Sequence, residues 1–318
     1  MTEAQLRALA GEYGVAQVGF CAPAPFTEWE KHRKTAHKAA QHLVSAPLEK
    51  APWARVIAIV VAPYQMYSSD GGAAVSAYYV EYNAVHARGE ALVSELNARG
   101  VQAQSLEIPL KAAAVRAGLG TYGKNDVVRI HGMGSCVMLR AIALGEGFEC
   151  AGDYPKEDSC ERIGCGTCRR CIDACPTGAL SGDEFDHTRC LRAHMFQGPP
   201  VPEEFRQKMG GRLLGCEECL RACPHNAHAF EKAIEPPDAL KRILDIRRAL
   251  VPEEREEYMR EFGALLGWNM AIPNRVIAQA LLVAGNLGMH ELKPLIEPLA
   301  ASKSPAVSEH ARWALERL

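Results

Sequence analysis

The sequence predicts an α+β protein in which a helix-covered sheet is followed by a cysteine-rich segment and a short helical tail. Strand and helix patterns alternate up to about residue 148, and eight of the twelve cysteines lie between Cys165 and Cys223. No strand pattern is recognisable after about residue 234. These observations predict three domains, over residues 1–148, 149–229 and 230–318.

The first domain is expected to contain a sheet covered by helices. Residues 54–62 form an apolar, β-branched run that is typical of a buried strand. A long helical pattern ends at Gly100, as a helix C-cap commonly does, and another begins with Pro109 in its first turn. The expected elements, in order, are helix 4–13, strand 15–20, strand 54–62, helix 74–99, strand 101–108, helix 109–117 and strand 137–144.

The spacing of the cysteines predicts two 4Fe–4S clusters in the second domain. One run has the spacing C-x2-C-x2-C-x3-C-P, whose fourth cysteine serves the other cluster in two-cluster ferredoxins. A lone cysteine and a C-x2-C-x3-C-P run follow it. If the last cysteine of each run likewise binds the other cluster, cluster 1 is bound by Cys165, Cys168, Cys171 and Cys223. Cluster 2 is then bound by Cys175, Cys190, Cys216 and Cys219. The chain is therefore expected to move electrons.

Zinc and disulfide bonds are the alternative interpretations of these cysteines. Zinc needs four ligands per site, and nothing in zinc binding calls for three closely spaced cysteines followed by a cysteine and a proline. A chain of 318 residues has no need of covalent cross-links to stabilise its core, and such cross-links are rare in reducing compartments. Both alternatives are therefore weaker than the cluster interpretation.

The third domain is expected to be a helical tail of the HEAT kind. Successive helical patterns joined by short turns containing Gly or Pro suggest paired-helix repeats, of which only about two fit. The patterns cover residues 238–251, 253–268, 274–287, 291–300 and 305–318. Two roles stay open for this tail, which are binding a partner and bracing the cluster domain.

The composition is typical of an intracellular protein with several buried cores. Hydrophobic residues make up 48% of the chain and charged residues 23%, and the net charge is −2. The N-terminus lacks a secretory signal, and no apolar run approaches a membrane span. These features predict a cytoplasmic protein without a membrane partner, in a compartment where thiolates stay reduced.

Segments of all three domains, which together extend over most of the chain, carry the motifs of a known family. They are Cys171-Ile-Asp-Ala-Cys175-Pro-Thr-Gly-Ala-Leu180, Arg189-Cys190, Gly215-Cys216-Glu-Glu-Cys219 and Cys223-Pro-His-Asn226 around the clusters, Arg116-Ala-Gly118-Leu-Gly120-Thr-Tyr-Gly123-Lys124-Asn125 upstream, and Asn274-Arg275, Ala284-Gly285-Asn286 and Ala311-Arg-Trp313-Ala-Leu315 downstream. These segments resemble the epoxyqueuosine reductase family. The resemblance implies a cobalamin-dependent reductase whose clusters pass electrons to cobalt. It also implies a cap fold akin to corrinoid-processing and reductive-dehalogenase domains, and an external electron donor of the ferredoxin or flavodoxin type.

Two glycine-rich segments are the candidates for contact with the cobalamin. Glycines allow a large planar ligand to approach the backbone, but they also serve tight turns at strand ends, and the sequence favours neither role. The segments do not form a dinucleotide fingerprint, because they follow a helical stretch where the fingerprint must follow a strand. The candidate residues are Gly118, Gly120, Tyr122, Gly123, Lys124, Asn125, Gly134 and Ser135.

The chain departs from the family at the proton donor. Epoxyqueuosine reductases carry an aspartate in the region that corresponds to residues 102–109, and this region contains no aspartate. Reductive cleavage of a bond leaves an anion that needs a proton. Glu107 is the first candidate donor by position and Tyr82 the second; Glu81 and Tyr122 are further candidates. The departure leaves the substrate open.

Three functions are consistent with the sequence. They are a corrinoid-dependent iron–sulfur reductase acting on a small molecule or modified nucleoside, an electron-transfer protein that activates a corrinoid protein partner, and a cluster protein without corrinoid. The charge balance disfavours tRNA as a partner, because residues 231–318 carry 12 Lys/Arg against 13 Asp/Glu. Residues 151–230 carry 10 against 12.

Overall fold

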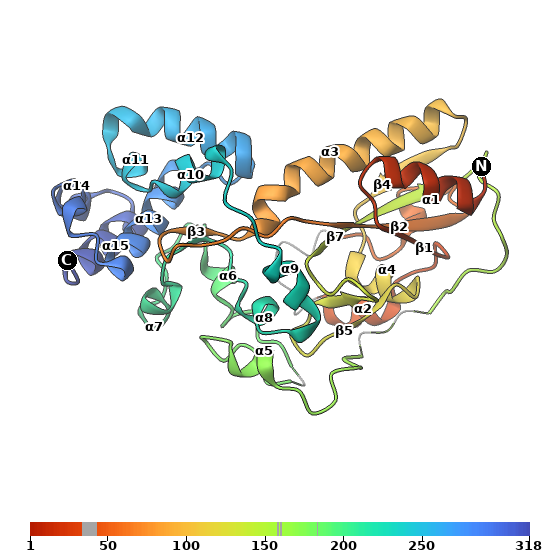
Figure 1. Cartoon of the computed structure of the whole chain (residues 1–318), viewed down its shortest axis with the longest axis horizontal. Coiled ribbons are helices and arrows are strands. Elements are labelled where there is room, and N and C mark those ends of the chain that lie inside the picture. Colours follow the sequence, from red (N-terminus) through yellow and green to blue (C-terminus); the bar gives the residue numbers. More distant parts are fainter. Residues whose placement is uncertain (34–42, 158, 160, 183) are drawn as a thin grey trace.

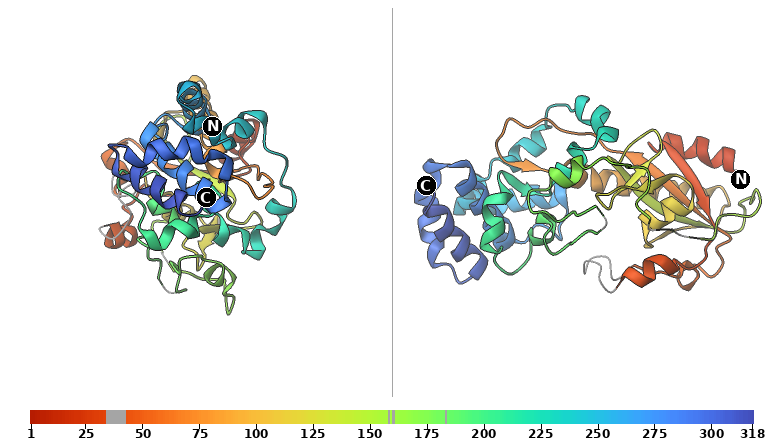
Figure 2. Two further views of the ribbon diagram at one scale, coloured as in Figure 1. Left: turned by 90° about the vertical axis from the view of Figure 1, so that its left-hand side faces the viewer. Right: turned by 90° about the horizontal axis from the view of Figure 1, so that it is seen from below.

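The computed structural model describes residues 1–33, 43–157, 159, 161–182 and 184–318. The strands of its main sheet lie toward one end of an elongated molecule, and the C-terminal helices lie at the other end (Figure 1). The cysteine-rich segment lies between them, as the right-hand view of Figure 2 also shows. The α+β fold class predicted from the sequence is confirmed.

The main sheet has four strands in the order β1-β2-β7-β4, and neighbouring strands are antiparallel. Strand β2 occupies a central position, and its apolar run is buried because both faces of the sheet are covered. Ile57, Ile59 and Val61 face one hydrophobic cluster, whereas Val56 and Val60 face the other. The strands are β1 (Gln17–Cys21), β2 (Val56–Pro63), β4 (Ala103–Leu106) and β7 (Val137–Leu144).

Helices cover both faces of this sheet. Leu6 of α1 (Glu3–Glu12) and Leu92 of α3 (Ala77–Ala98) pack on one face, and α4 (Leu110–Arg116) contributes to the opposite face. A further helix, α2 (Thr27–Arg33), directly follows the buried Phe26. Each predicted strand and helix of residues 1–148 is present, with ends that differ by a few residues.

The start of helix α3 differs from the prediction. Residues 74 and 75 form strand β3 (Ala74–Val75), which pairs in parallel with β8 (Arg212–Leu214). The N–H of Ala74 donates to the carbonyl of Gly211 at 2.8 Å, and that of Ser76 donates to Leu214 at 2.7 Å. Because these amides are bonded to a distant strand, the helix begins only at Ala77. This pairing joins the sheet domain to the cysteine-rich segment.

The cysteine-rich segment consists of loops and short helices. A small hairpin of β5 (Gly120–Tyr122) and β6 (Val128–Ile130) precedes it in the chain, between α4 and β7. The helices of the segment are α5 (Arg170–Asp173), α6 (Leu191–His194), α7 (Glu203–Arg206), α8 (Glu218–Arg221) and α9 (Ala227–Glu231).

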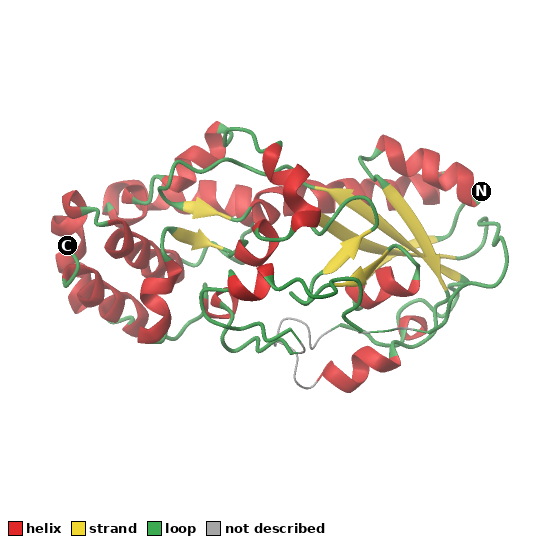
Figure 3. Ribbon diagram, turned by 60° about the horizontal axis from the view of Figure 1, so that its bottom comes forward, coloured by secondary structure: helices red, strands yellow, loops and turns green. Residues whose placement is uncertain are grey.

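The C-terminal part is helical within the described residues, as Figure 3 shows. The helix predicted over 238–251 is divided in two, and residues 290–301 contain only one α-helical turn between 3₁₀ turns. The grouping into HEAT-like repeats stays a prediction. The helices are α10 (Asp238–Leu244), α11 (Arg247–Leu250), α12 (Pro252–Leu266), α13 (Pro273–Leu287), α14 (Lys293–Ile296) and α15 (Pro305–Leu315). Within the described part of the chain, we find no helix with the length and apolar character to span a membrane.

Candidate functional site

A cavity of about 920 Å³ lies between helix α3 and the sheet. Strands β4 and β7 form one wall, and α3 forms the opposite wall. The start of α4, the β5–β6 hairpin and residues 43, 44 and 50 also contribute to the lining. Its described residues include Tyr78, Tyr82, Val85, His86 and Glu90 of α3, residues 104–108 and 137–141 of the sheet region, and Lys111, Val127, Val128 and Ser135.

Helix α3 presents a polar and aromatic row to the cavity. Tyr78, Tyr82, His86 and Glu90 are spaced by four residues, and this spacing brings them to one face of the helix. The Tyr78 and Tyr82 rings are 5.8 Å apart, and the Tyr82 and His86 rings are 6.1 Å apart. The two tyrosines are 37% and 43% exposed, so their rings are available to a ligand.

A charged network forms part of the sheet-side wall. Arg140 of β7 forms an ion pair with Glu90 of α3, and the Ser105 hydroxyl donates to the same carboxylate at 2.7 Å. Gly89 makes room for this arginine, since a Cβ at position 89 would lie 2.6 Å from Arg140 Nε. Sequence reasoning missed this network. The repeat of Tyr82, His86 and Glu90 at every fourth position was the signal in the sequence that could have placed Glu90 on the same helix face.

The structure separates the four candidate proton donors. Glu107 and Tyr82 both line the cavity. The Tyr67 hydroxyl donates to the Glu81 carboxylate, and neither Glu81 nor Tyr122 is among the described lining residues. The carboxyl group of Glu107 has no hydrogen bond or ion pair within the described part of the chain. Glu107 and Tyr82 are therefore the candidates that could reach a ligand in the cavity.

Four of the eight predicted cobalamin-contacting residues, Lys124, Asn125, Gly134 and Ser135, contact the cysteine-rich segment. Ser135 lines the cavity, whereas the seven others are outside its described lining. Lys124 donates through Nζ to the carbonyls of Gly166 and Cys168, at 2.6 and 3.2 Å. Gly118 lies just after α4 and has a φ of 68°, which is the left-handed conformation of a turn that ends a helix. This conformation agrees with the turn role of the glycine.

Ser135 connects the cavity wall to a cluster loop. Its backbone N–H donates to Asn226 Oδ1 at 2.6 Å, and Asn226 Nδ2 donates to the Leu220 carbonyl at 2.9 Å. Asn226 is fully buried and lies three residues after Cys223. The preceding Gly134 has a φ of 76°, and a Cβ at that position would lie 2.4 Å from Asn226 Oδ1. A wall of the cavity and the loop of a predicted cluster ligand are thus packed directly together.

The thiols of cluster 1 lie close enough to affect one another. Burial raises the pKa of the Cys171 thiol, and the neighbouring Cys165, Cys223 and Cys168 raise it further. These are the four residues predicted to bind cluster 1. Iron coordination requires thiolates, so the positive iron would offset the cost of ionising such crowded thiols.

The thiols of cluster 2 are similarly close. Burial raises the pKa of Cys219, with further contributions from its neighbours Cys216, Cys190, Cys171 and Cys175. Three of these neighbours belong to the predicted set of cluster 2, and Cys171 belongs to that of cluster 1. The two predicted sites are therefore near each other, as electron transfer between them requires. The chemistry of both donor sets fits iron–sulfur clusters.

Cys175 is the thiol whose surroundings favour its ionised form. Burial acts against ionisation, but backbone hydrogen bonds from Thr177 and Ala179 outweigh it, and the pKa is lowered. The N–H of Ala179 lies 3.3 Å from Cys175 Sγ. Hydrogen bonds of this kind also stabilise the sulfur ligands of iron–sulfur clusters.

Residues 164–226 match the family model of the 4Fe-4S double cluster binding domain. The match contains the eight cysteines predicted to bind the two clusters.

Curated epoxyqueuosine reductases are similar to a large part of the chain. The protein of Bacillus subtilis (strain 168) is 31% identical over 221 residues, which are 67% of this chain and 54% of that protein. The protein of Lactococcus garvieae (strain Lg2) is 32% identical over 216 residues, or 65% of this chain and 58% of that protein. The chain thus spans a little more than half the length of these curated relatives.

Solved structures establish the fold over nearly the whole chain. An epoxyqueuosine reductase from Streptococcus thermophilus superposes with a TM-score of 0.80 at 21% identity, covering 99% of this chain and 90% of that one. One from Bacillus subtilis superposes with a TM-score of 0.78 at 22% identity, with the same coverage. The curated relatives and the matched cluster domain support membership of an epoxyqueuosine reductase-like family, and the solved structures share the fold of this chain.

Proposed function

We propose that this protein is an iron–sulfur oxidoreductase with two 4Fe–4S clusters that supply electrons to a corrinoid in the cavity beneath helix α3. The substrate is a small molecule or a modified nucleoside that is reduced at the corrinoid. An external ferredoxin- or flavodoxin-type protein donates the electrons. We place these reactions in the cytoplasm, where the cysteine ligands remain reduced.

The cavity is suited to a large cofactor. Its volume of about 920 Å³ is near the upper end of the range for ligand pockets. The Tyr78 and Tyr82 rings on one wall and the apolar side chains of Val137 and Met138 on the other would hold the corrinoid. When bound, a corrinoid supplies a cobalt centre that transfers electrons to the substrate. The protein's part is to position the substrate beside it and to exclude water.

The hydrogen bond between Ser135 and Asn226 is the single observation that carries the proposal most directly. It fastens the cavity wall to the loop that contains Cys223. A second link involves Tyr78, which lies near the Arg192 guanidinium, two residues after Cys190. Ligand loops of both predicted clusters therefore border the cavity region. This proximity favours electron transfer from the clusters into the cavity over a purely structural role for them.

Glu107 is the proposed proton donor. Its carboxyl group lines the cavity, where it would hold a proton on a side-chain oxygen and deliver it to the reduced substrate. Tyr82 lies in the same cavity and carries a hydroxyl that could serve instead. The family's aspartate is absent at the corresponding place in the sequence, so a glutamate there would provide the same chemistry.

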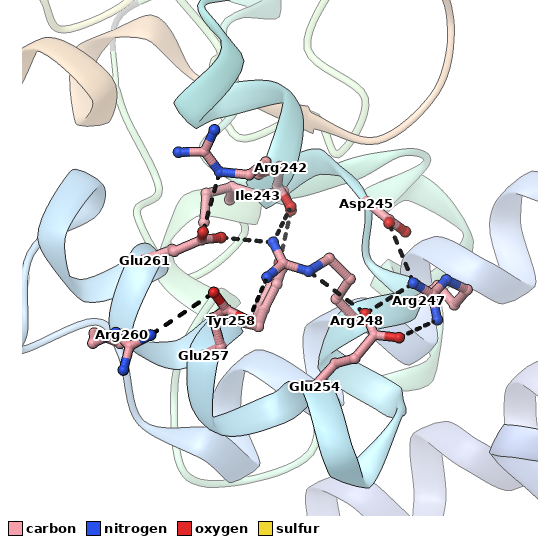
Figure 4. A network of polar contacts seen from close by, with 10 residues as sticks. All are labelled: Arg242, Ile243, Asp245, Arg247, Arg248, Glu254, Glu257, Tyr258, Arg260 and Glu261. Carbon is pink, nitrogen blue, oxygen red and sulfur yellow. Dashed lines mark hydrogen bonds and ion pairs between the residues drawn. The ribbon is translucent and has the colours of Figure 1, made fainter.

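The surface charges support a substrate smaller than a whole tRNA. One epoxyqueuosine reductase has been solved with a tRNA stem loop, but the basic cluster on α10 and α11 of this chain is neutralised. Arg247 makes two hydrogen bonds to Glu254, at 2.7 and 2.8 Å, and Arg248 and Arg242 both pair with Glu261 (Figure 4). Paired arginines contribute little to phosphate binding. We therefore favour a small molecule or an isolated modified nucleoside.

Anaerobic reconstitution tests the proposal. The full chain would be treated with iron and sulfide, and then with cobalamin, and separated from unbound material. We expect about eight irons per chain, from two four-iron clusters, and a corrinoid absorbance that co-elutes with the protein. Eight irons without corrinoid would contradict the proposed cofactor and favour a protein that transfers electrons to a partner. Fewer than four irons would contradict the cluster assignment as well.

A further inference from the structure

Tyr79 has a buried hydroxyl group that none of the preceding contacts explains. The side chain is only 8% exposed, and its hydroxyl has no hydrogen-bond partner within the described part of the chain. A buried hydroxyl without a partner destabilises a folded protein, since it has lost its bonds to water. A phenylalanine would fill the same space without this cost. We therefore expect the hydroxyl to have a hydrogen-bond partner that is not among the described protein atoms.

The contacts of the Tyr79 ring indicate where that partner lies. Gly215 packs against the hydroxyl end of the ring, because a Cβ at position 215 would lie 3.0 Å from Tyr79 Cε2. The guanidinium carbon of Arg192 lies 4.6 Å from the centre of the ring. Gly215 directly precedes Cys216, and Arg192 follows Cys190 by two residues. Both neighbours thus lie within two residues of predicted ligands of cluster 2.

We propose that the Tyr79 hydroxyl donates a hydrogen bond to a sulfur of cluster 2, either a bridging sulfide or a cysteine ligand. This inference rests on the cluster-binding part of the proposed function and is independent of the corrinoid. Reduction adds negative charge to the cluster, and a donor aimed at sulfur stabilises that charge. The hydrogen bond from Tyr79 therefore makes the reduction potential of cluster 2 higher than it would be without this hydroxyl.

The substitution Tyr79→Phe tests this role in the reconstituted full-length protein. The ring is kept and only the oxygen is removed, so we expect the iron content and the circular dichroism spectrum to be unchanged. A redox titration followed by electron paramagnetic resonance should show a lower potential for one of the two clusters. We expect about a tenfold change in the equilibrium constant for its one-electron reduction, or about 59 mV.

Tyr258→Phe is the matched control. Tyr258 is buried in the same hydrophobic cluster as Tyr79, but its hydroxyl donates to the Ile243 carbonyl at 2.7 Å. We expect this variant to lose some stability and to keep both cluster potentials. A drop in potential in both variants would mean that loosened packing is the cause, which would overturn the inference.

Electron–nuclear double resonance of the reduced protein provides a second readout. We expect one solvent-exchangeable proton coupled to the cluster in the parent protein, and its loss in Tyr79→Phe. If both clusters assemble but the potentials and the proton signal are the same with and without the hydroxyl, Tyr79 is a packing residue and the inference is wrong. If the parent protein assembles no clusters, the proposed function itself fails.

Discussion

Glu107 and Glu90 both place carboxyl groups on the wall of the cavity, but their surroundings differ. Glu90 is bound to Arg140 and Ser105, which fixes its carboxylate in place. Glu107 is exposed to the cavity and has no side-chain partner within the described residues. Only a carboxyl group that is free to exchange its proton can act as a general acid. Glu107 is therefore the better suited of the two.

Replacing Glu107 by glutamine tests this assignment. We expect turnover to fall by about 10²- to 10⁴-fold, the usual contribution of a general acid, while iron and corrinoid remain bound. Turnover would be followed with epoxyqueuosine and related nucleosides under a low-potential reductant. Glu81→Gln is the control, because Glu81 is bound by Tyr67 outside the described lining of the cavity. Full activity of Glu107→Gln alongside an inactive Tyr82→Phe would transfer the role to Tyr82.

Gly134 shows how a single residue can hold the cavity wall against a cluster loop. Its positive φ and its close approach to Asn226 and His225 exclude a side chain. Gly132 has a similar φ of 73°, but a Cβ there would meet no atom within 4 Å. Both glycines thus need a positive φ, but only at Gly134 do neighbouring atoms also exclude a side chain.

Alanine substitutions at these two glycines separate the two effects. Gly132→Ala should lower the free energy of unfolding by roughly 1–2 kcal/mol, the cost of a left-handed backbone with a Cβ. Gly134→Ala carries this cost and a clash with backbone atoms, so we expect a loss of about 3 kcal/mol or more and weaker iron retention at cluster 1. Urea unfolding and iron analysis measure both. Equal losses in the two variants would show that the packing against Asn226 has no energetic role.

At the scale of elements, the predictable features are those with a local signal. The buried strand β2 and the capped helix α3 were evident because hydrophobic periodicity and Gly100 mark them in the sequence. Strand β3 was missed because its partner β8 lies more than 130 residues away and supplies the bonds that stop the helix from starting earlier. The cavity was missed for the same reason. Its walls come from α3 and β7, which no local pattern brings together.

Helix α15 is attached to the rest of the molecule through His310. Its Nδ1 lies 2.9 Å from the Ala278 carbonyl of α13, and its Nε2 accepts the N–H of Val201 at 2.9 Å. Burial lowers the pKa of this imidazole to about 4, and the nearby Arg206 guanidinium lowers it further. A protonated ring could not accept the bond from Val201. The neutral ring therefore connects the helical tail to the cysteine-rich segment.

This contact predicts a loss of stability in acid. A group whose pKa is lower in the folded state stabilises the fold above its ordinary pKa of about 6.5, and this stabilisation is lost as the pH falls toward 4. Between pH 7.5 and 5.0 we expect His310 to account for a loss of about 2 kcal/mol. Urea unfolding of the parent and of His310→Gln at both pH values gives the difference. If the two proteins lose the same amount, His310 is not the group responsible.

At the scale of the whole molecule, the cysteine-rich segment lies between a cavity and a helical tail. The ligand loops contact the cavity side through Lys124 and Asn226, and the tail packs with β8 and with the first residues of α3. The cysteine pattern predicted the electron carriers from the sequence alone, since cluster ligation is a local property. The cavity that we propose as the acceptor site is formed by distant segments of the chain, so no local pattern in the sequence predicts it.

The central claim is that the clusters supply electrons to a corrinoid in the cavity. It is tested most directly by measuring anaerobic electron transfer within the protein that contains both clusters and corrinoid. The clusters would be reduced and freed from excess reductant, and then mixed with oxidised cobalamin while the absorbance of both centres is recorded. We predict that the clusters are reoxidised at the same rate at which the bound corrinoid is reduced, and that this rate saturates with cobalamin concentration. Clusters that stay reduced beside a bound, oxidised corrinoid would contradict the claim.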